Sequence, residues 1–158
     1  MEKLYAYRDF EVYNEKNEKV AIATSKWVCF DTMKMSIAKI DENIINAYTI
    51  ENPSVFENDI QKLKEPESFL DVCTISTTRD MIDANKHVHN LNYIDFASQI
   101  LPYEIMQEAN DIEVMFKKEI KENDIVKCFY SIENDEHYVT IKSEDEKILH
   151  AIIKLKIV

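Results

Sequence analysis

The sequence predicts an α+β fold in which one antiparallel β-sheet wraps around a single central helix. Residues 90–101 carry apolar side chains at helical spacing, and four β-rich segments follow them, joined by turns rich in Asn and Asp. The apolar face of that helix has no second long helix to pack against. We therefore expect the sheet formed by these strands to bury it.

The first third of the chain predicts a hairpin and a connector. Residues 5–14 and 19–31 are rich in Tyr, Val, Ile and Thr and flank the polar run NEKNE, which indicates two paired strands. Residues 33–67 mix polar residues with Pro53 and Pro66, and we expect a connector there with at most short helical turns. The alternating run DVCTISTTR then predicts another strand.

The central helix and the final strands follow from periodicity. Leu91, Ile94, Ala97 and Leu101 line one helical face, and Asn90 is the candidate N-cap. The later strands are expected at residues 112–120, 124–133, 137–144 and 147–158.

The chain contains no glycine, whereas average usage of about 7% predicts on the order of eleven in a chain of this length. Glycine-rich phosphate loops, dinucleotide fingerprints and nucleophile elbows are therefore excluded. Turns that need a positive φ must use Asn or Asp, the residues that best tolerate it. The candidates are Asn14, Asn17, Asn123, Asn134 and Asp135.

Charge and hydropathy limit the partners. Lys and Arg number 19 against 30 Asp and Glu, a formal charge of -11, which argues against nucleic acid and anionic membranes. No signal-peptide core opens the chain, and no apolar run approaches the roughly 20 residues that span a bilayer. We expect a cytoplasmic protein.

The cysteines and three of the histidines give no sign of a metal or cofactor site. Cys29, Cys73 and Cys128 are odd in number and lack C-x-x-C spacing, so we expect buried thiols. Three histidines have no partners at metal-ligand spacing, so we expect them at surface or interface positions. They are His89, His137 and His150.

The run TTRDMIDANKHVHNLNYIDF concentrates the polar groups best suited to catalysis. Asp83, Asn85 and His87 alternate within five residues, and Glu119 lies further along, in the strand-like segment IEVMFKKEI. Such groups can orient water or a carbonyl, which makes these four a candidate site. The structural alternative is an Asx turn for the Asp-x-Asn stretch and a surface ion pair of Glu119 with Lys117 or Lys121.

This run resembles the acyl-acyl-carrier-protein (acyl-ACP) thioesterases of plants and bacteria. FKKEIKENDIV is similar to the family segment that bears a catalytic Glu, and YRDFEVYNEKNEKVAIATSKWVCFD is similar to the closing hairpin of the family's first domain. The resemblance implies that Asp83, Asn85, His87 and Glu119 are catalytic and that Asn90 and Tyr93 bind substrate. We expect no cofactor or metal. The residues in register with the family motif are Arg79, Asp83, Asn85, His87, Val88, Asn90 and Tyr93.

The resemblance also implies a hotdog fold, and two hotdog domains in tandem. Residues 1–32 would be the closing strands of a partial first repeat, 33–67 the connector, and 68–158 the complete second hotdog domain. The first strand and helix of the first repeat are expected to be absent. Because a hotdog sheet with open edges is normally completed by a second one, we expect a homodimer.

The implied activity is hydrolysis of acyl-ACP to free fatty acid and carrier-protein thiol, with acyl carrier protein as the partner. Glu119 would be the general base, with a pKa raised by partial burial, and His87 would orient water or protonate the leaving thiolate. Asn85 would position the carbonyl or the water. Asp83 would hold Asn85 or His87 in orientation.

Three positions depart from the family pattern. Lys86 and His89 stand where relatives often carry Gly or Gln and Asn, and Ile120 follows the Glu where plant members have Cys. This last change excludes a nucleophilic cysteine at that place, so we expect water to attack. Backbone N–H groups at the helix start, near His89 and Asn90, are expected to face the oxyanion.

Two other functions stay open at this point. A hotdog thioesterase for coenzyme A esters would need a basic groove for the adenosine phosphates, which so acidic a chain does not reveal. A non-catalytic acyl-binding or assembly module is suggested by the missing part of the first repeat.

Overall fold

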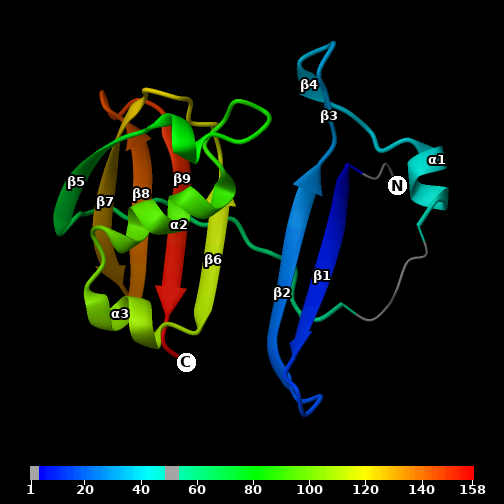
Figure 1. Cartoon of the computed structure of the whole chain (residues 1–158), viewed down its shortest axis with the longest axis horizontal. Helices are drawn as coiled ribbons and strands as arrows, with labels where there is room; N and C mark the ends of the chain where they lie inside the picture. The colour runs from blue at the N-terminus through cyan, green and yellow to red at the C-terminus, as the bar shows by residue number, and fades with distance from the viewer. Residues whose placement is uncertain (1–3, 49–53) are drawn as a thin grey trace. The chain divides into compact units, whose positions relative to one another are not determined.

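The computed structural model describes residues 4–48 and 54–158, and the chain forms two compact units, residues 1–61 and 62–158 (Figure 1). The division falls within the predicted connector. Residues 49–53 of that connector, Pro53 among them, lie outside the described residues, as do residues 1–3 of the predicted first domain. The predicted domain organisation stays a prediction.

The first unit is built on the predicted hairpin. β1 (Tyr5–Tyr13) and β2 (Lys19–Val28) pair in antiparallel register. A second small hairpin joins β3 (Phe30–Asp31) to β4 (Ser36–Ile37), and α1 (Glu42–Asn46) is a single short helix. The predicted connector thus begins with little regular structure, as expected.

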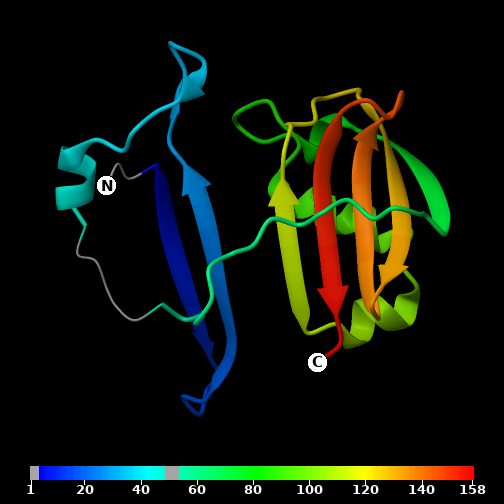
Figure 2. The ribbon, with the colours of Figure 1, turned by 180° about the vertical axis from the view of Figure 1, so that it is seen from behind.

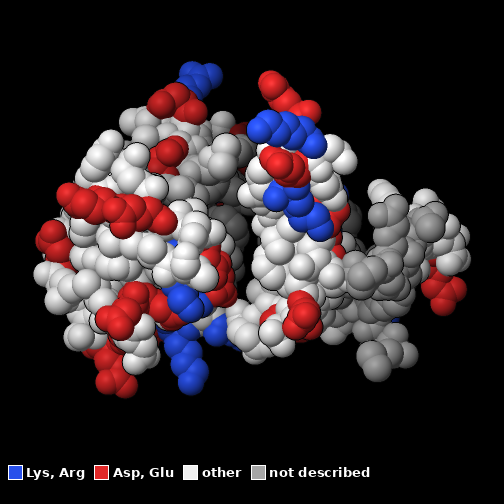
Figure 3. All heavy atoms as spheres, turned by 90° about the horizontal axis from the view of Figure 1, so that it is seen from below, with Lys and Arg blue, Asp and Glu red and all other residues white. Residues whose placement is uncertain are grey.

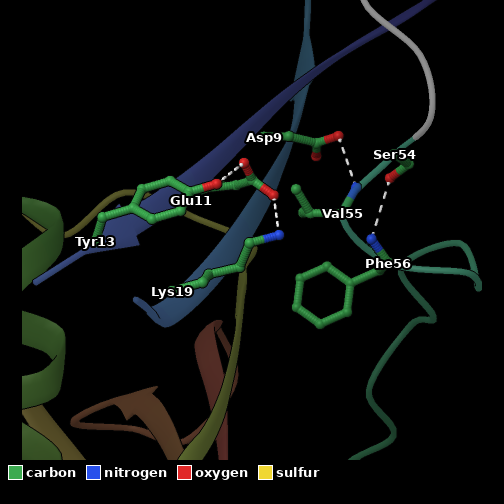
Figure 4. Close-up of polar contacts among 7 residues, drawn as sticks. All are labelled: Asp9, Glu11, Tyr13, Lys19, Ser54, Val55 and Phe56. Atoms are coloured by element: carbon green, nitrogen blue, oxygen red, sulfur yellow. Dashed lines mark hydrogen bonds and ion pairs between the residues drawn. The ribbon is translucent and has the colours of Figure 1, made fainter. Parts of the chain in front are cut away.

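The end of the first unit returns to its hairpin. The Val55 N–H donates to Asp9 Oδ2 at 3.3 Å, and the Phe56 N–H donates to Ser54 Oγ at 3.4 Å (Figure 4). Lys19 forms an ion pair with Glu11 across the two strands. These contacts are polar and exposed, so they hold the backbone without creating a core.

The second unit contains one five-stranded antiparallel sheet, with α2 (Asn90–Ser98) lying across one face (Figure 1). The strand order is β5-β7-β8-β9-β6, and every neighbouring pair is antiparallel. This confirms the predicted α+β fold class. The strands are β5 (Asp71–Ser76), β6 (Asp111–Phe116), β7 (Ile125–Glu133), β8 (Glu136–Ser143) and β9 (Leu149–Lys156).

The buried face of α2 differs from the predicted one. Tyr93, Phe96 and Ala97 are buried, whereas Leu91 is 68% exposed. The prediction that Leu91 belongs to the core face is therefore wrong, because the two aromatic side chains turn the helix toward the sheet. His89 is the N-cap in place of Asn90, and its Nδ1 accepts the Leu91 N–H at 3.2 Å.

The helix also ends earlier than predicted. α2 stops at Ser98, and a separate short helix, α3 (Tyr103–Glu108), begins after Pro102. Proline disfavours helical geometry in the residue before it, Leu101 here, which explains the break. Leu101 still joins the core at 7% exposure.

The sheet meets the helix with alternate residues of its three central strands. Strand alternation places these side chains on one face, where each fully buried one contributes roughly 1.5–3 kcal/mol. They are Val126, Cys128 and Tyr130 of β7, Val139 and Ile141 of β8, and Ala151, Ile153 and Leu155 of β9.

The opposite face of the sheet is covered by the start of the second unit. Residues 62–70 cross this face in Figure 2. Phe69 packs on Phe129 with ring centroids 4.7 Å apart, and the Lys142 ammonium lies over both rings. Lys142 also forms an ion pair with Glu65. The sheet is therefore packed on both faces.

Among the residues that the structure describes, seven adopt a positive φ, and none of them is glycine. Four were predicted, and Asn134 and Asp135, with φ of 52° and 62°, form the two-residue loop between β7 and β8 that favours this geometry. Asn14 was predicted wrongly, because its side chain accepts two backbone N–H bonds instead, each at 2.9 Å. The sequence did not indicate the others, which are Met35, Lys86 and Glu146.

The thiols and the charged surface complete the description. All three cysteines are free, and Cys73 lies directly opposite Cys128 in the pairing of β5 with β7.

In the part of the chain that the structure describes, no helix has the length and apolar character needed to cross a membrane. Acidic side chains are spread over the face shown in Figure 3, with basic ones among them.

Candidate functional site

Asp83 organises the loop that precedes α2. Its Oδ1 accepts the N–H of Asn85 at 2.8 Å and of His87 at 3.1 Å, and its Oδ2 lies 3.4 Å from Asn85 Nδ2. The hydrogen bond from the His87 N–H is the largest cause of the lowered pKa of the Asp83 carboxyl. The Asp-x-Asn stretch is thus an Asx turn, and the same turn places Asn85 and His87 on one short loop.

The base of this loop is closed by backbone pairing. Ile82 and Val88 form an isolated antiparallel bridge, and the His89 N–H donates to Met81 O at 2.8 Å. The expectation that the His89 N–H faces an oxyanion is therefore wrong, because that donor is already used. Among the backbone groups described at this helix start, the Asn90 N–H makes no hydrogen bond.

Glu119 does not lie in a strand. β6 ends at Phe116, and the next two N–H groups, of Lys117 and Lys118, both donate to His150 O, at 2.8 and 3.3 Å. The predicted strand over residues 112–120 is therefore too long. Because two successive donors share one acceptor, the backbone turns out of the sheet before it reaches Glu119.

The Glu119 segment meets the Asp83 loop through the backbone. The Val88 N–H donates to Ile120 O at 2.8 Å, which joins the residue after His87 to the residue after Glu119. The structure thus brings Asp83, Asn85, His87 and the Glu119 segment to one end of the sheet.

The Glu119 carboxylate has a positive neighbour that lowers its pKa. Lys118 Nζ lies 2.9 Å from Glu119 Oε1, and the Glu119 side chain is one-third exposed. Lys118 is the largest cause of the lowered Glu119 pKa, and nearby His87 adds a smaller electrostatic effect in the same direction. The expectation of a pKa raised by burial is therefore wrong: Glu119 is ionised at neutral pH.

The two predicted substrate-binding residues lie in different surroundings. Asn90 is exposed at the start of α2, whereas Tyr93 is 3% exposed and lies edge-on to Phe116, with ring centroids 5.1 Å apart. Burial raises the pKa of Tyr93, and a backbone hydrogen bond from Ile120 partly offsets the shift. Tyr93 therefore contacts the Glu119 segment from within the core.

The structure also changes the description of the remaining histidines. His150 is 5% exposed, and its Nδ1 lies 2.9 Å from Lys118 O, so the predicted surface or interface position is wrong for it. His137 is half-buried and shares a 2.7 Å hydrogen bond with the Tyr130 hydroxyl. Within residues 4–48 and 54–158, no three His, Cys, Asp or Glu side chains are grouped as metal ligands would be.

Two family models match the chain. The acyl-ACP thioesterase N-terminal domain matches residues 1–48, and the acyl-ACP thioesterase C-terminal domain matches residues 71–155, more than half of the chain. The chain belongs to the acyl-ACP thioesterase family. The resemblance inferred from the Asp83 to Tyr93 motif is confirmed.

Curated relatives are plant enzymes longer than this acyl-ACP thioesterase family member. It is 27% identical over 139 residues to the chloroplastic oleoyl-acyl carrier protein thioesterase of Coriandrum sativum, with 80% of this chain and 37% of that protein covered. The chloroplastic palmitoyl-acyl carrier protein thioesterase of Gossypium hirsutum is 27% identical over 145 residues, with 85% and 35% covered. The chain spans less than two-fifths of the length of these relatives.

Solved structures show the same fold. The 12:0-ACP thioesterase from Umbellularia californica matches with a TM-score of 0.85 at 16% identity, covering 98% of this chain and 62% of that one. An acyl-ACP thioesterase from Bacteroides thetaiotaomicron matches with a TM-score of 0.82 at 19% identity, covering 99% and 64%. The predicted hotdog fold is confirmed.

Proposed function

We propose that the protein hydrolyses the thioester of acyl-ACP, releasing a free fatty acid and the carrier-protein thiol. The observation that carries the proposal is the 2.8 Å bond from the Val88 N–H to Ile120 O, since it joins the loop of Asp83, Asn85 and His87 to the segment of Glu119. Membership of the acyl-ACP thioesterase family supports the same reaction.

In this proposal Glu119 is the general base. Its pKa is lowered, so at neutral pH it is a carboxylate that can accept a proton from water, and the pairing with Lys118 makes it a weaker base than an unpaired glutamate. The water attacks the thioester carbon, the carbonyl π electrons move to oxygen, and the tetrahedral intermediate expels the thiolate. His87 orients the water or protonates this thiolate, and Ile120 supplies no nucleophile of its own.

Asn85 and Asp83 have supporting roles. The Asn85 amide positions the carbonyl or the water, while Asp83 holds the Asn85 side chain and the His87 backbone through the contacts of the Asx turn. The unused Asn90 N–H at the start of α2 is the backbone donor that remains for the oxyanion. A well-placed donor of this kind stabilises the transition state by roughly 3–4 kcal/mol.

Thiol release from a long-chain acyl-ACP tests the proposal. Glu119→Gln and His87→Ala are each expected to lower kcat by about 100- to 10,000-fold, the usual contribution of a general acid or base. Glu122→Gln is the matched control, because Glu122 is exposed and lies three residues further along. Near-normal turnover in both site variants would overturn the proposal.

The same assay decides between the alternatives. Faster release from an acyl coenzyme A than from the matching acyl-ACP would favour the coenzyme A thioesterase. Binding of a long-chain thioester without thiol release would favour the non-catalytic module.

We also propose a homodimer. The outer strands β5 and β6 leave the two edges of the five-stranded sheet unpaired within the described residues, and open edges are normally covered. Sedimentation of a monomer at micromolar concentration would contradict this.

A further inference from the structure

His150 makes three hydrogen bonds to the two residues that precede Glu119. Its carbonyl oxygen accepts the N–H of Lys117 at 2.8 Å and of Lys118 at 3.3 Å, and its ring Nδ1 lies 2.9 Å from the Lys118 carbonyl oxygen. The side chain is buried on β9, and in the part of the chain that the structure describes it forms no hydrogen bond with the Asp83 loop. The proposed reaction gives it no chemical step.

The hydrogen-bond partner of the His150 ring determines that its Nδ1 carries a hydrogen. A carbonyl oxygen only accepts, so His150 Nδ1 must carry the hydrogen and donate it to Lys118 O. This bond is partly buried, with the ring on the buried side, and an unsatisfied carbonyl is costly there, so the ring and the Lys118 carbonyl hold each other in place.

The carbonyl held in this way belongs to the peptide group between Lys118 and Glu119. Because a peptide group is planar, fixing the Lys118 C=O also fixes the Glu119 N–H and the direction in which the Glu119 Cα continues. On the far side, the Ile120 carbonyl is held by the Val88 N–H at 2.8 Å. Glu119 therefore stands between two anchored carbonyls, one held by His150 and one by the loop of His87.

We propose that His150 is a positioning residue, whose ring N–H holds the Lys118–Glu119 peptide so that the Glu119 carboxylate is directed at the His87 loop. This rests on the proposed function, in which Glu119 is the general base. A base displaced by about 1 Å can lose on the order of 100-fold in rate, so a residue that never touches substrate can control kcat.

Replacements with and without a donor test the proposal in the full chain. The Asn amide nitrogen reaches nearly the same place as His Nδ1 and donates, whereas Leu has similar volume and no donor. We expect His150→Leu to lower kcat for acyl-ACP about 10- to 100-fold with KM within about twofold, and His150→Asn to restore most of the loss. Assays run well below the melting temperature of each variant separate positioning from unfolding.

The outcomes are distinct. Equal losses in His150→Leu and His150→Asn, or an unchanged kcat in His150→Leu, would overturn the positioning role. If the Leu variant does not fold, His150→Val supplies a donor-free residue suited to a strand. Loss of activity in Glu119→Gln with full activity in the donor-free variant would refute only the role of His150, whereas full activity in Glu119→Gln would refute the proposed function itself.

Discussion

Replacing Tyr93 with Phe tests whether this residue supports the Glu119 segment or binds substrate. Tyr93 is 3% exposed, and the Ile120 backbone acts to lower the pKa of its hydroxyl, which places the Ile120 N–H near the phenol oxygen; the Ile120 side chain is fully buried. Phenylalanine keeps the ring and its edge-on packing against Phe116 but removes the oxygen. The Ile120 N–H then loses this polar neighbour in a place that water does not readily reach.

The expected loss of stability follows from that one polar contact. An intramolecular hydrogen bond contributes about 0.5–1.5 kcal/mol net, and a buried donor left unsatisfied costs about 1–3 kcal/mol. We therefore expect Tyr93→Phe to lower the free energy of unfolding by roughly 1–2 kcal/mol. With a slope of about 2 kcal/mol/M, the urea midpoint should fall by about 0.5–1 M.

Urea unfolding followed by circular dichroism measures this shift, with Tyr103→Phe as the control. Tyr103 is 74% exposed, so the control should stay within about 0.5 kcal/mol of the parent protein. Equal midpoints for the two variants would refute the reasoning. A raised KM without a change in stability would instead support the predicted contact of Tyr93 with substrate.

Three further predictions concern the pKa of Glu119, the positive φ of Lys86 and the reactivity of Cys128. Lys118→Gln removes the first cause of the lowered Glu119 pKa, so Glu119 takes up its proton at higher pH and the acid limb of the pH–rate profile should move to higher pH. Lys86→Asn should raise the free energy of unfolding by up to about 1 kcal/mol, because Asn tolerates the φ of 64° better. Native Cys128 should resist iodoacetamide, since burial raises its pKa and the thiolate is the reactive form.

Each has its own control. Lys117→Gln changes the same charge next to Lys118 and should leave the acid limb in place; an equal shift in both variants would contradict the pairing with Glu119. Ala84→Asn adds Asn to the same loop at a residue without positive φ, so an equal stabilisation would show that φ is not the cause. Mass spectrometry reports alkylation, and rapid labelling of Cys128 in the folded chain would contradict its burial.

The sheet was predictable from the sequence, but the face of the helix was not. Alternation along β7, β8 and β9 matches their pairing closely. In α2, apolar residues occur on two sides, so residue spacing alone assigns Leu91 to the buried face as readily as Phe96. The choice depends on which side chains fill the space above the sheet, and local sequence does not contain that information.

The identity of the candidate site residues was predictable, but the electrostatics of Glu119 were not. Consecutive side chains point to opposite faces of a strand, so a strand through Glu119 would separate it from Lys118. The two meet because the backbone leaves the sheet after Phe116, where the N–H groups of Lys117 and Lys118 share the carbonyl oxygen of His150, a residue remote in sequence. In the sequence, His150 is one residue of a strand-like run, and no neighbouring residue indicates that it contacts the segment before Glu119.

The lack of glycine has a thermodynamic consequence. Glycine loses more conformational freedom on folding than any other residue, so a chain without it starts from a narrower unfolded ensemble. The opposing penalty is carried by native dihedral angles, at positions such as Met35, Lys86 and Glu146, where a side chain is forced into the left-handed region. The backbone strain of the turns is thus concentrated at a few positions, and a single substitution at each of them can remove it.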